Sequence, residues 1–515
     1  MGIPYYFQNI ITQYDCVVNH HKTGCDRLYI DFNCIVHQSA MNHTSHDAII
    51  DASIAYIDNL CQITNPTDLV YIAVGGVCSR AKMNQQRKRV YMSLWQKKYL
   101  DDESVWDGNN TTPGTEFMDK MDYALMKYSI GNTMCKIICS PSVEMGEGDY
   151  KIIHHLRTQT PNSNKNVIVY GLDPDMILLA LVLQAEYKNI TLSLIRETQE
   201  FDISSTKSEL YSLDISQLIC GIDNTFCPLD DSFTTYEKIR EFVMLTIFLG
   251  NDFLPPLSCL NTNNGGLDIL CGVYACTREV DKCMRFILPN KSINWTCLDE
   301  FMRNLQKNEE AYYIKASDDY YNCRPYYQNS SMSDKHYHLE NFTSLNKFQS
   351  GICASHIGWR KEYNKMLFPH VGDIVDSACH IYTDGIEWNT EYYFKGIIAP
   401  MSSWYYPHPY SPTIKDVSDF ISIRTCTRDY VSLAFVPKIY SSIMQMLIVM
   451  PPESIKRYLP AYTQLLTDPE FECMDMYPMH FQIMTYLKSQ IWECLPILPD
   501  IHEERLEKGI EILRL

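Results

Sequence analysis

Several features that would assign a protein to a special class are missing from this sequence. It has 20 cysteines but no C-x-x-C pair, and the closest spacings are Cys135/Cys139 and Cys271/Cys276. Neither a zinc site nor a dithiol motif is therefore predicted, and reduced, mostly buried thiols are expected. No uninterrupted apolar run approaches about 18 residues, and the N-terminus lacks the charged and apolar parts of a signal peptide. We expect a soluble, cytoplasmic protein with no membrane segment.

Positive charge is also scarce. The chain has 44 Lys and Arg against 62 Asp and Glu, which gives a formal net charge of −18. Such a protein has no general attraction for nucleic acids or anionic membranes, so a local basic pocket must bind any polyanion. The 515 residues, 46% of them hydrophobic, suffice for two or more domains. A monomer is expected.

Short apolar segments alternate with helix-favouring stretches in the first half of the chain. The segments predicted as strands are 27–32, 69–74, 136–139 and 167–170, and helices are predicted over 46–61 and from about 80 and 113. This alternation predicts an α/β fold with a mostly parallel central sheet flanked by helices. We expect this core to span 1–275, a polar linker and covering segment to span 276–350, and a helical, aromatic-rich region to span 351–515.

The helix expected from about Arg80 follows a buried strand and a Gly-Gly turn. In it, Lys82, Gln86 and Arg89 stand at i, i+4 and i+7, on one face and within about 10 Å along the axis. This arrangement predicts a compact cationic site at the end of a strand. A solvated helix surface would give the same pattern.

Six acidic residues each follow an apolar segment or a glycine turn: Asp31, Glu147, Asp149, Asp173, Asp175 and Asp252. In open α/β sheets ligands bind beyond the carboxyl ends of the strands, and buried carboxylates that converge there require cations. Oxygen ligands without a His/Cys set favour Mg²⁺ or Mn²⁺, and two such ions support phosphodiester hydrolysis. Any one of these acids could instead be a simple helix N-cap.

Longer segments identify a family. They are MGIPYYF (1–7), YIDFNCIVH (29–37), RAKMNQQRKR (80–89), TPGTEFM (112–118), GEGDYKI (146–152), YGLDPDMILLAL (170–181), FLGNDFLPPL (248–257), GIEWNTEYYFKG (385–396), WYYPHPYSP (404–412) and LIVMPPESIKRYLP (447–460). In this order they resemble the Xrn family of 5′→3′ exoribonucleases, relatives of the flap endonucleases. The resemblance implies a PIN-like nuclease core and a second conserved region, 351–515, that completes the active-site pocket.

The resemblance also implies roles for the residues. The six acids would be the catalytic residues and would bind two Mg²⁺ or Mn²⁺ ions, and Lys82, Gln86 and Arg89 would receive the 5′-monophosphate of single-stranded RNA in a pocket too small for a cap or triphosphate. His37 would stack on a base opposite a tryptophan, taken to be Trp404, at about 1–3 kcal/mol per base. Processive hydrolysis to mononucleotides is expected, with decapping factors as possible partners.

Three positions depart from the family pattern. Gly75 stands where the family has a metal-binding aspartate, Asp149 replaces a glutamate, and Val90 replaces an arginine that follows Arg89. We expect either a weakened nuclease or a catalytically degenerate relative that binds RNA 5′ ends or decapping partners. A flap-type DNA nuclease is disfavoured because the second region matches the RNA enzymes. The short chain after that region predicts a compact member, such as one from a large DNA virus.

Overall fold

The structure is a computed structural model. It describes residues 3, 5–14, 17–19, 24–102, 106–131, 135–159, 163–171, 173–197, 210–227, 232–325, 333–348, 352, 354–368, 374–396, 402–427, 430, 432 and 435–514.

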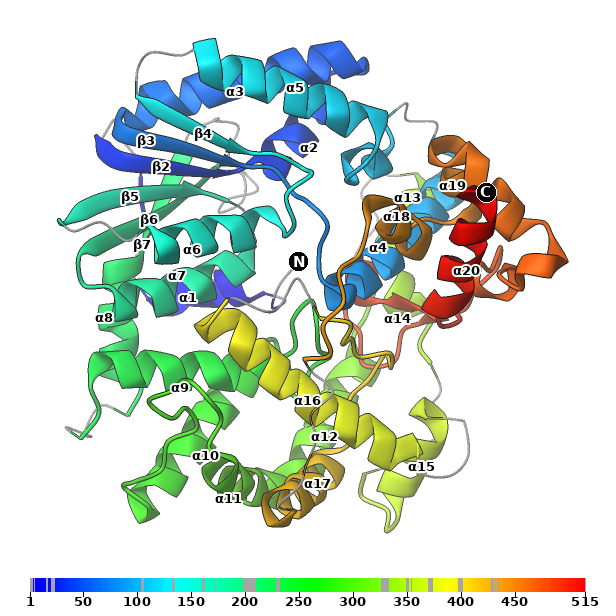
Figure 1. The fold of residues 1–515 in the computed structure, drawn as a ribbon. Coiled ribbons are helices and arrows are strands. Elements are labelled where there is room, and N and C mark those ends of the chain that lie inside the picture. The colour runs from blue at the N-terminus through cyan, green and yellow to red at the C-terminus, as the bar shows by residue number, and fades with distance from the viewer. Residues whose placement is uncertain are drawn as a thin grey trace.

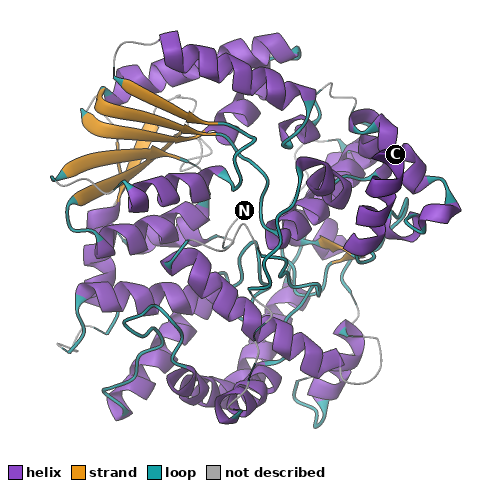
Figure 2. Cartoon of the chain, viewed as in Figure 1, coloured by secondary structure: helices purple, strands orange, loops and turns teal. Residues whose placement is uncertain are grey.

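A seven-stranded sheet organises the first half of the chain (Figures 1 and 2). Its strands are β1 (Val17–Asn19), β2 (Cys25–Asp31), β3 (Pro66–Ala73), β4 (Lys136–Ser140), β5 (Lys165–Tyr170), β6 (Ile190–Glu197) and β7 (Leu210–Asp214), in the order β1-β7-β6-β5-β2-β3-β4. The five strands from β6 to β4 are parallel, whereas β7 is antiparallel to both β6 and β1. The predicted α/β class with a mostly parallel sheet is confirmed.

Side chains that alternate along the strands build a core on each face of the sheet. Leu28 and Ile30 of β2 belong to the hydrophobic cluster formed with α2 (Phe32–Asn42), α3 (His46–Thr64) and α5 (Glu116–Gly131). Tyr29 between them belongs to the opposite cluster, formed with α6 (Gly148–Thr158), α7 (Pro174–Glu186) and α9 (Thr235–Ile247). The period-2 geometry of a strand thus explains why its apolar run is continuous: both faces are covered.

The segment expected to be a linker, 276–350, is largely helical. It contains the end of α10 (Gly266–Val280), α11 (Trp295–Leu305), α12 (Glu309–Asn322), α13 (Asp334–Glu340) and α14 (Phe342–Leu345). Leu298, Phe301, Met302 and Leu305 of α11 are fully buried in the main core. Their helical spacing was obscured by the many polar residues between them, and the division of the chain into a core, a linker and covering segment, and a second conserved region stays a prediction.

The rest of the chain adds few strands. Its elements are α15 (Trp359–Leu367), α16 (Ile374–Phe394), α17 (Ile414–Cys426), α18 (Ser442–Val449), α19 (Pro452–Tyr458), β8 (Ile483–Met484), β9 (Leu495–Pro496) and α20 (Glu503–Arg514), and earlier in the chain come α1 (Tyr6–Gln13) and α8 (Ile215–Thr225). Figure 2 shows the resulting contrast between the sheet-containing part and the helical remainder.

Helix α4 (Arg80–Leu100) leaves the sheet and packs against the C-terminal helices α18 and α20 (Figure 1). Arg80, buried at its start, donates to Glu503 of α20 at 2.6 Å. Arg87 donates to the backbone oxygens of Met476 and Pro499, each at 2.6 Å. Two basic side chains of α4, Arg80 and Arg87, therefore anchor the C-terminal segment.

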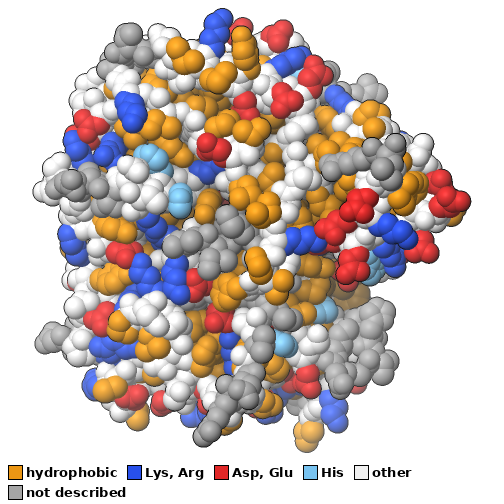
Figure 3. All heavy atoms as spheres, viewed as in Figure 1, with side chains coloured by type: hydrophobic (Ala, Val, Ile, Leu, Met, Phe, Trp, Pro, Cys, Tyr) orange, Lys and Arg blue, Asp and Glu red, His pale blue; other side chains and the backbone are white. Residues whose placement is uncertain are grey.

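Figure 3 shows that lysine and arginine are interspersed with aspartate and glutamate on the face in view. None of the described helices combines the length and the apolar character needed to cross a bilayer. The cysteines that the structure describes all have free thiols.

Candidate active site

The carboxyl ends of three parallel strands, β2, β5 and β4, lead into acidic residues. Asp31 is the last residue of β2 and pairs in register with Ala73 of β3. Asp173 follows β5 and caps α7, where its carboxylate accepts the amide of Asp175 at 3.1 Å. Glu147 lies directly before α6, the helix that follows β4. These side chains meet at one edge of the sheet because parallel strands end together there.

The acids form a crowded cluster. Carboxylate oxygens of Asp173, Asp175 and Asp252 all lie within 4.8 Å of one another. Burial raises the pKa of Asp175 well above its usual range, and the charges of Asp173 and Asp252 add to the effect. Burial together with Asp149 and Asp173 raises the pKa of Asp31 to about 7. Converging carboxylates that resist ionisation are the donor set that a divalent cation requires.

Gly148 allows the acidic residues of this cluster to approach one another. A Cβ atom on Gly148 would come within 2.3 Å of an Asp31 carboxylate oxygen and 3.2 Å of the Ala73 carbonyl oxygen. Only glycine therefore allows the start of α6, with Glu147 and Asp149, to approach the end of β2. The glycine between the two acids is a packing requirement of the site.

Lys82 joins the cationic helix face to the acids. Its buried ammonium lies 3.0 Å from Glu147 and 2.9 Å from Asp252. Burial alone would lower the pKa of Lys82, but these two carboxylates raise it well above the usual range. The same ammonium, in turn, holds the pKa of Asp252 below its usual range against the opposing effect of burial.

Gln86 and Arg89 lie along the same face as Lys82, as the helical spacing predicts. The Gln86 amide oxygen accepts from Gln445 of α18 at 3.2 Å. Arg89 is exposed and near enough to Asp252 and His37 to influence the pKa of each. Partial desolvation lowers the pKa of His37 to about 4, with a further contribution from Arg89, so its exposed ring is neutral at pH 7.

Trp404 does not join this group. Its side chain is 5% exposed, stacks on Trp388 at a centroid distance of 5.3 Å, and donates from Nε1 to the Ile381 carbonyl oxygen. An indole enclosed in this way has no free face for a base. The expectation that Trp404 and His37 stack on opposite sides of a base is therefore corrected. Trp404 is a core residue of the main hydrophobic cluster.

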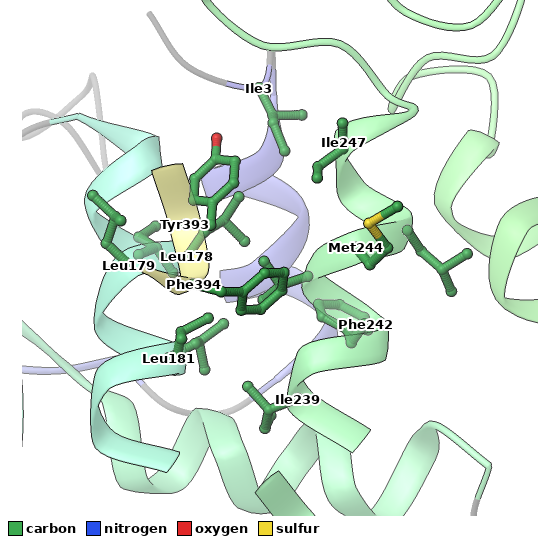
Figure 4. Close-up of a cluster of buried hydrophobic side chains, with 14 of the residues drawn as sticks. Ile3, Leu178, Leu179, Leu181, Ile239, Phe242, Met244, Ile247, Tyr393 and Phe394 are labelled. Atoms are coloured by element: carbon green, nitrogen blue, oxygen red, sulfur yellow. The ribbon is translucent and has the colours of Figure 1, made fainter. Parts of the chain in front are cut away.

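Two tyrosines that the sequence reasoning missed contact the acids directly. Tyr392 donates to Asp149 and Tyr393 donates to Asp175, each at 2.9 Å. Both come from the end of α16, which inserts between α7 and α9, as the position of Tyr393 and Phe394 in Figure 4 shows. The segment GIEWNTEYYFKG contains them, and their adjacency at the end of one helix was the available signal.

The two glycines in the turn after β3 differ in how much room each leaves for a side chain. A Cβ on Gly76 would lie 1.7 Å from the Glu144 carbonyl oxygen, whereas a Cβ on Gly75 would meet only the Asn33 side chain, at 2.6 Å from Nδ2. The Gly75 amide donates to the Asn33 amide oxygen at 3.0 Å. The Asn33 carboxamide therefore occupies the space beside Gly75. Val90, the other departure on α4, packs against the C-terminal hydrophobic cluster.

Family models match most of the chain. The model described as "XRN 5'-3' exonuclease N-terminus" matches residues 1–198, and the model described as "Xrn1 helical domain" matches 233–354 and 315–514. Among solved structures, the catalytic core of Rad2 in complex with DNA substrate aligns with 11% identity and a TM-score of 0.31 over 72% of this chain and 99% of that chain. That score is too low for a comparison of details.

Curated relatives align along nearly the whole chain. The 5'-3' exoribonuclease 1 of Homo sapiens is 26% identical over 99% of this chain and 34% of its own length. The 5'-3' exoribonuclease 2 of Gallus gallus is 24% identical over 99% of this chain and 70% of its own length. The 5'-3' exoribonuclease 1 of Schizosaccharomyces pombe is 24% identical over 98% of this chain and 48% of its own length. With both family models matched in order, the chain belongs to the Xrn family of 5'-3' exonucleases.

Proposed function

We propose that this protein is a 5′→3′ exoribonuclease that hydrolyses uncapped, 5′-monophosphorylated single-stranded RNA processively to mononucleotides. The observation that supports it most is the double ion pair of Lys82 with Glu147 and Asp252. This contact brings the cationic face of α4 to the acidic edge of the sheet. A terminal phosphate and the scissile phosphodiester can then be bound side by side.

The acidic residues fit two divalent cations. Asp31, Glu147, Asp149, Asp173, Asp175 and Asp252 would hold them, and hard oxygen donors without a histidine or thiolate favour Mg²⁺ or Mn²⁺. The raised pKa values of Asp31, Asp149 and Asp175 support this assignment because they reflect crowding that cations relieve. Such ions supply an activated water and stabilise the leaving oxygen in phosphodiester hydrolysis.

The protein residues position the RNA and the acids. Lys82, Gln86 and Arg89 would bind the 5′-phosphate, with Lys82 exchanging its carboxylate partners for the phosphate once cations neutralise them. The exposed, neutral ring of His37 is available to stack on a base. Tyr392 and Tyr393 donate to Asp149 and Asp175 and so fix the orientation of both carboxylates.

Gly75 lowers the metal affinity in this proposal. Disturbing even an outer-shell partner costs about 10–100-fold in metal affinity, so losing a carboxylate ligand should cost at least that much. We therefore infer a nuclease that needs more Mg²⁺ or Mn²⁺ than a family member with the full set of acids.

The test follows 3′-labelled RNA bearing a 5′-monophosphate, a 5′-triphosphate or a 5′-hydroxyl, with Mg²⁺ and with Mn²⁺. The expected result is release of mononucleotides from the monophosphate substrate, abolished by Asp173→Ala. Asp214→Ala is the matched control because Asp214 also caps a helix, α8, through backbone amides. RNA binding without release of nucleotides in either metal would contradict the enzyme and leave the degenerate, RNA-binding relative.

A further inference from the structure

A cavity lies next to the acidic cluster. This cavity, of about 560 Å³, extends from Asn251 and Asp252 between α4 and α12, two helices labelled in Figure 1, and the segment 487–495. Its volume is within the range of about 300–1,000 Å³ typical of small-molecule sites. The face of α4 that lines it includes Gln85, Lys88 and Arg89. Lys82 and Gln86 are not among its lining residues, so the cavity adjoins the proposed 5′-phosphate receptor only at Arg89.

Two lysines face this cavity without an acidic partner. Lys88 and Lys488 both line it, and no carboxylate of the described residues lies within 4.0 Å of either ammonium group. Burial lowers the pKa of Lys88 to about 8; the charges of Arg87, Arg80 and Lys488 add to this effect, and that of Asp500 opposes it. Lysine ammonium groups that lack an ion-pair partner favour a bound anion.

The walls of the cavity suit an aromatic ring with polar edges. Tyr5 and Trp492 line it with their ring centroids 5.2 Å apart, and the Trp492 side chain is 42% exposed. Both amide atoms of Gln85 and the hydroxyl of Thr262 are buried and have no hydrogen-bond partner among the described residues. Buried polar atoms without partners are uncommon in proteins and indicate that a ligand completes their hydrogen bonds.

We propose that this cavity binds a free nucleoside 5′-monophosphate, with the phosphate between Lys88 and Lys488 and the base against Tyr5 and Trp492. The inference rests on the proposed function, because nucleoside monophosphates are the product of that reaction. The cavity includes Asp252 in its wall, so a nucleotide released at the acidic cluster is formed beside it. The site then delays the departure of the product and makes it an inhibitor of the next turnover.

Calorimetric titration of the full-length protein with AMP, adenosine and inorganic phosphate, in EDTA and without RNA, tests the site. AMP should bind more tightly than adenosine or phosphate, and Lys88→Met and Lys488→Met should each weaken AMP about tenfold or more, since each removes a charged phosphate contact. Methionine keeps the apolar stem of lysine, and thermal melting checks that each variant is folded. Lys98→Met, on the same helix but outside the cavity and paired with Glu453, should leave AMP binding unchanged.

Three results would overturn the proposal: no AMP binding to the folded protein, binding indifferent to both lysine variants, or binding lost on Gln86→Ala but kept in the lysine variants. The last would place the nucleotide in the 5′-phosphate receptor. The titration needs neither metal nor turnover, so its failure is separate from a failure to degrade RNA. A protein that binds AMP through the two lysines but never cleaves RNA would keep this site and lose the proposed function.

Discussion

Replacing Gly75 with aspartate should return a carboxylate to the metal site. Gly75 follows β3, next to the end of β2 where Asp31 stands, and its Cβ position is blocked only by the Asn33 side chain. Displacing a flexible carboxamide costs about 0.5–1.5 kcal/mol in rotamer energy, and losing its bond to the Gly75 amide costs a similar amount. The substitution is therefore tolerable at this glycine, whereas at Gly76 it would collide with backbone.

The expected gain is larger than this cost when metal is present. A restored ligand should raise metal affinity about 10–100-fold, equivalent to about 1.4–2.8 kcal/mol. In EDTA the same carboxylate adds to the repulsion around Asp31 and should lower the melting temperature. The variant should thus be less stable than the parent without metal and gain more stability when Mg²⁺ or Mn²⁺ is added.

Two measurements check this: melting temperature against metal concentration, and the rate of mononucleotide release against metal concentration. Gly75→Asn is the matched control, because it makes the same steric demand on Asn33 without adding charge. Adding Asn33→Ala to Gly75→Asp removes the steric conflict and should enlarge the gain. If Gly75→Asp leaves the half-saturating metal concentration unchanged while folded, even with Asn33→Ala, Gly75 is not what limits metal binding.

Three further perturbations test other parts of the site. Gly148→Ala should reduce RNA hydrolysis at least tenfold and lower the melting temperature, because its Cβ would displace the Asp31 carboxylate; unchanged kinetics would contradict the close approach of α6 to β2. In EDTA, the free energy of unfolding measured by urea denaturation should fall from pH 5 to pH 7.5. Burial raises the pKa values of Asp31 and Glu147 to about 7 in the folded protein, so between about pH 4 and 7 these two groups bind protons more tightly in the folded state than in the unfolded state. Mg²⁺ should abolish that fall, and a pH-independent stability in EDTA would refute the crowding argument. Glu503→Gln should destabilise the protein by about 3–5 kcal/mol, since it leaves the buried Arg80 without its carboxylate, and a loss below 1 kcal/mol would show that the contact is dispensable.

The sequence allowed us to predict the strands, helices and turns that depend on short-range patterns along the chain. The strand that ends in Asp31, the helix that starts at His46 and the helix that starts at Arg80 are all found within a few residues of where the pattern placed them. Each is a short-range signal: an apolar run, a turn glycine, or a cap followed by helix formers. The parallel arrangement of the predicted strands also allowed us to predict the sheet edge at which the carboxylates meet.

Long-range contacts were beyond such signals. Nothing near Tyr393 in the sequence indicates that its hydroxyl binds Asp175, 218 residues away. Trp404 was assigned to stacking on a base, but it stacks on Trp388, and both roles require the same kind of residue. The polar composition of the surrounding stretch also concealed α11 from prediction, although the apolar residues of this helix keep helical spacing.

Helix α4 shows why the C-terminal segment matters to a site built from the N-terminal sheet. One face of α4 presents Lys82 to Glu147 and Asp252, and the opposite side is held by Glu503 through Arg80. Gln86, on the same face as Lys82, is oriented by Gln445 of α18. A rigid helix that is fixed at both sides keeps the cationic groups at constant distances from the acids. In the proposed function, this fixed arrangement explains how a few lysines and arginines would bind a phosphate in a protein whose net charge is −18.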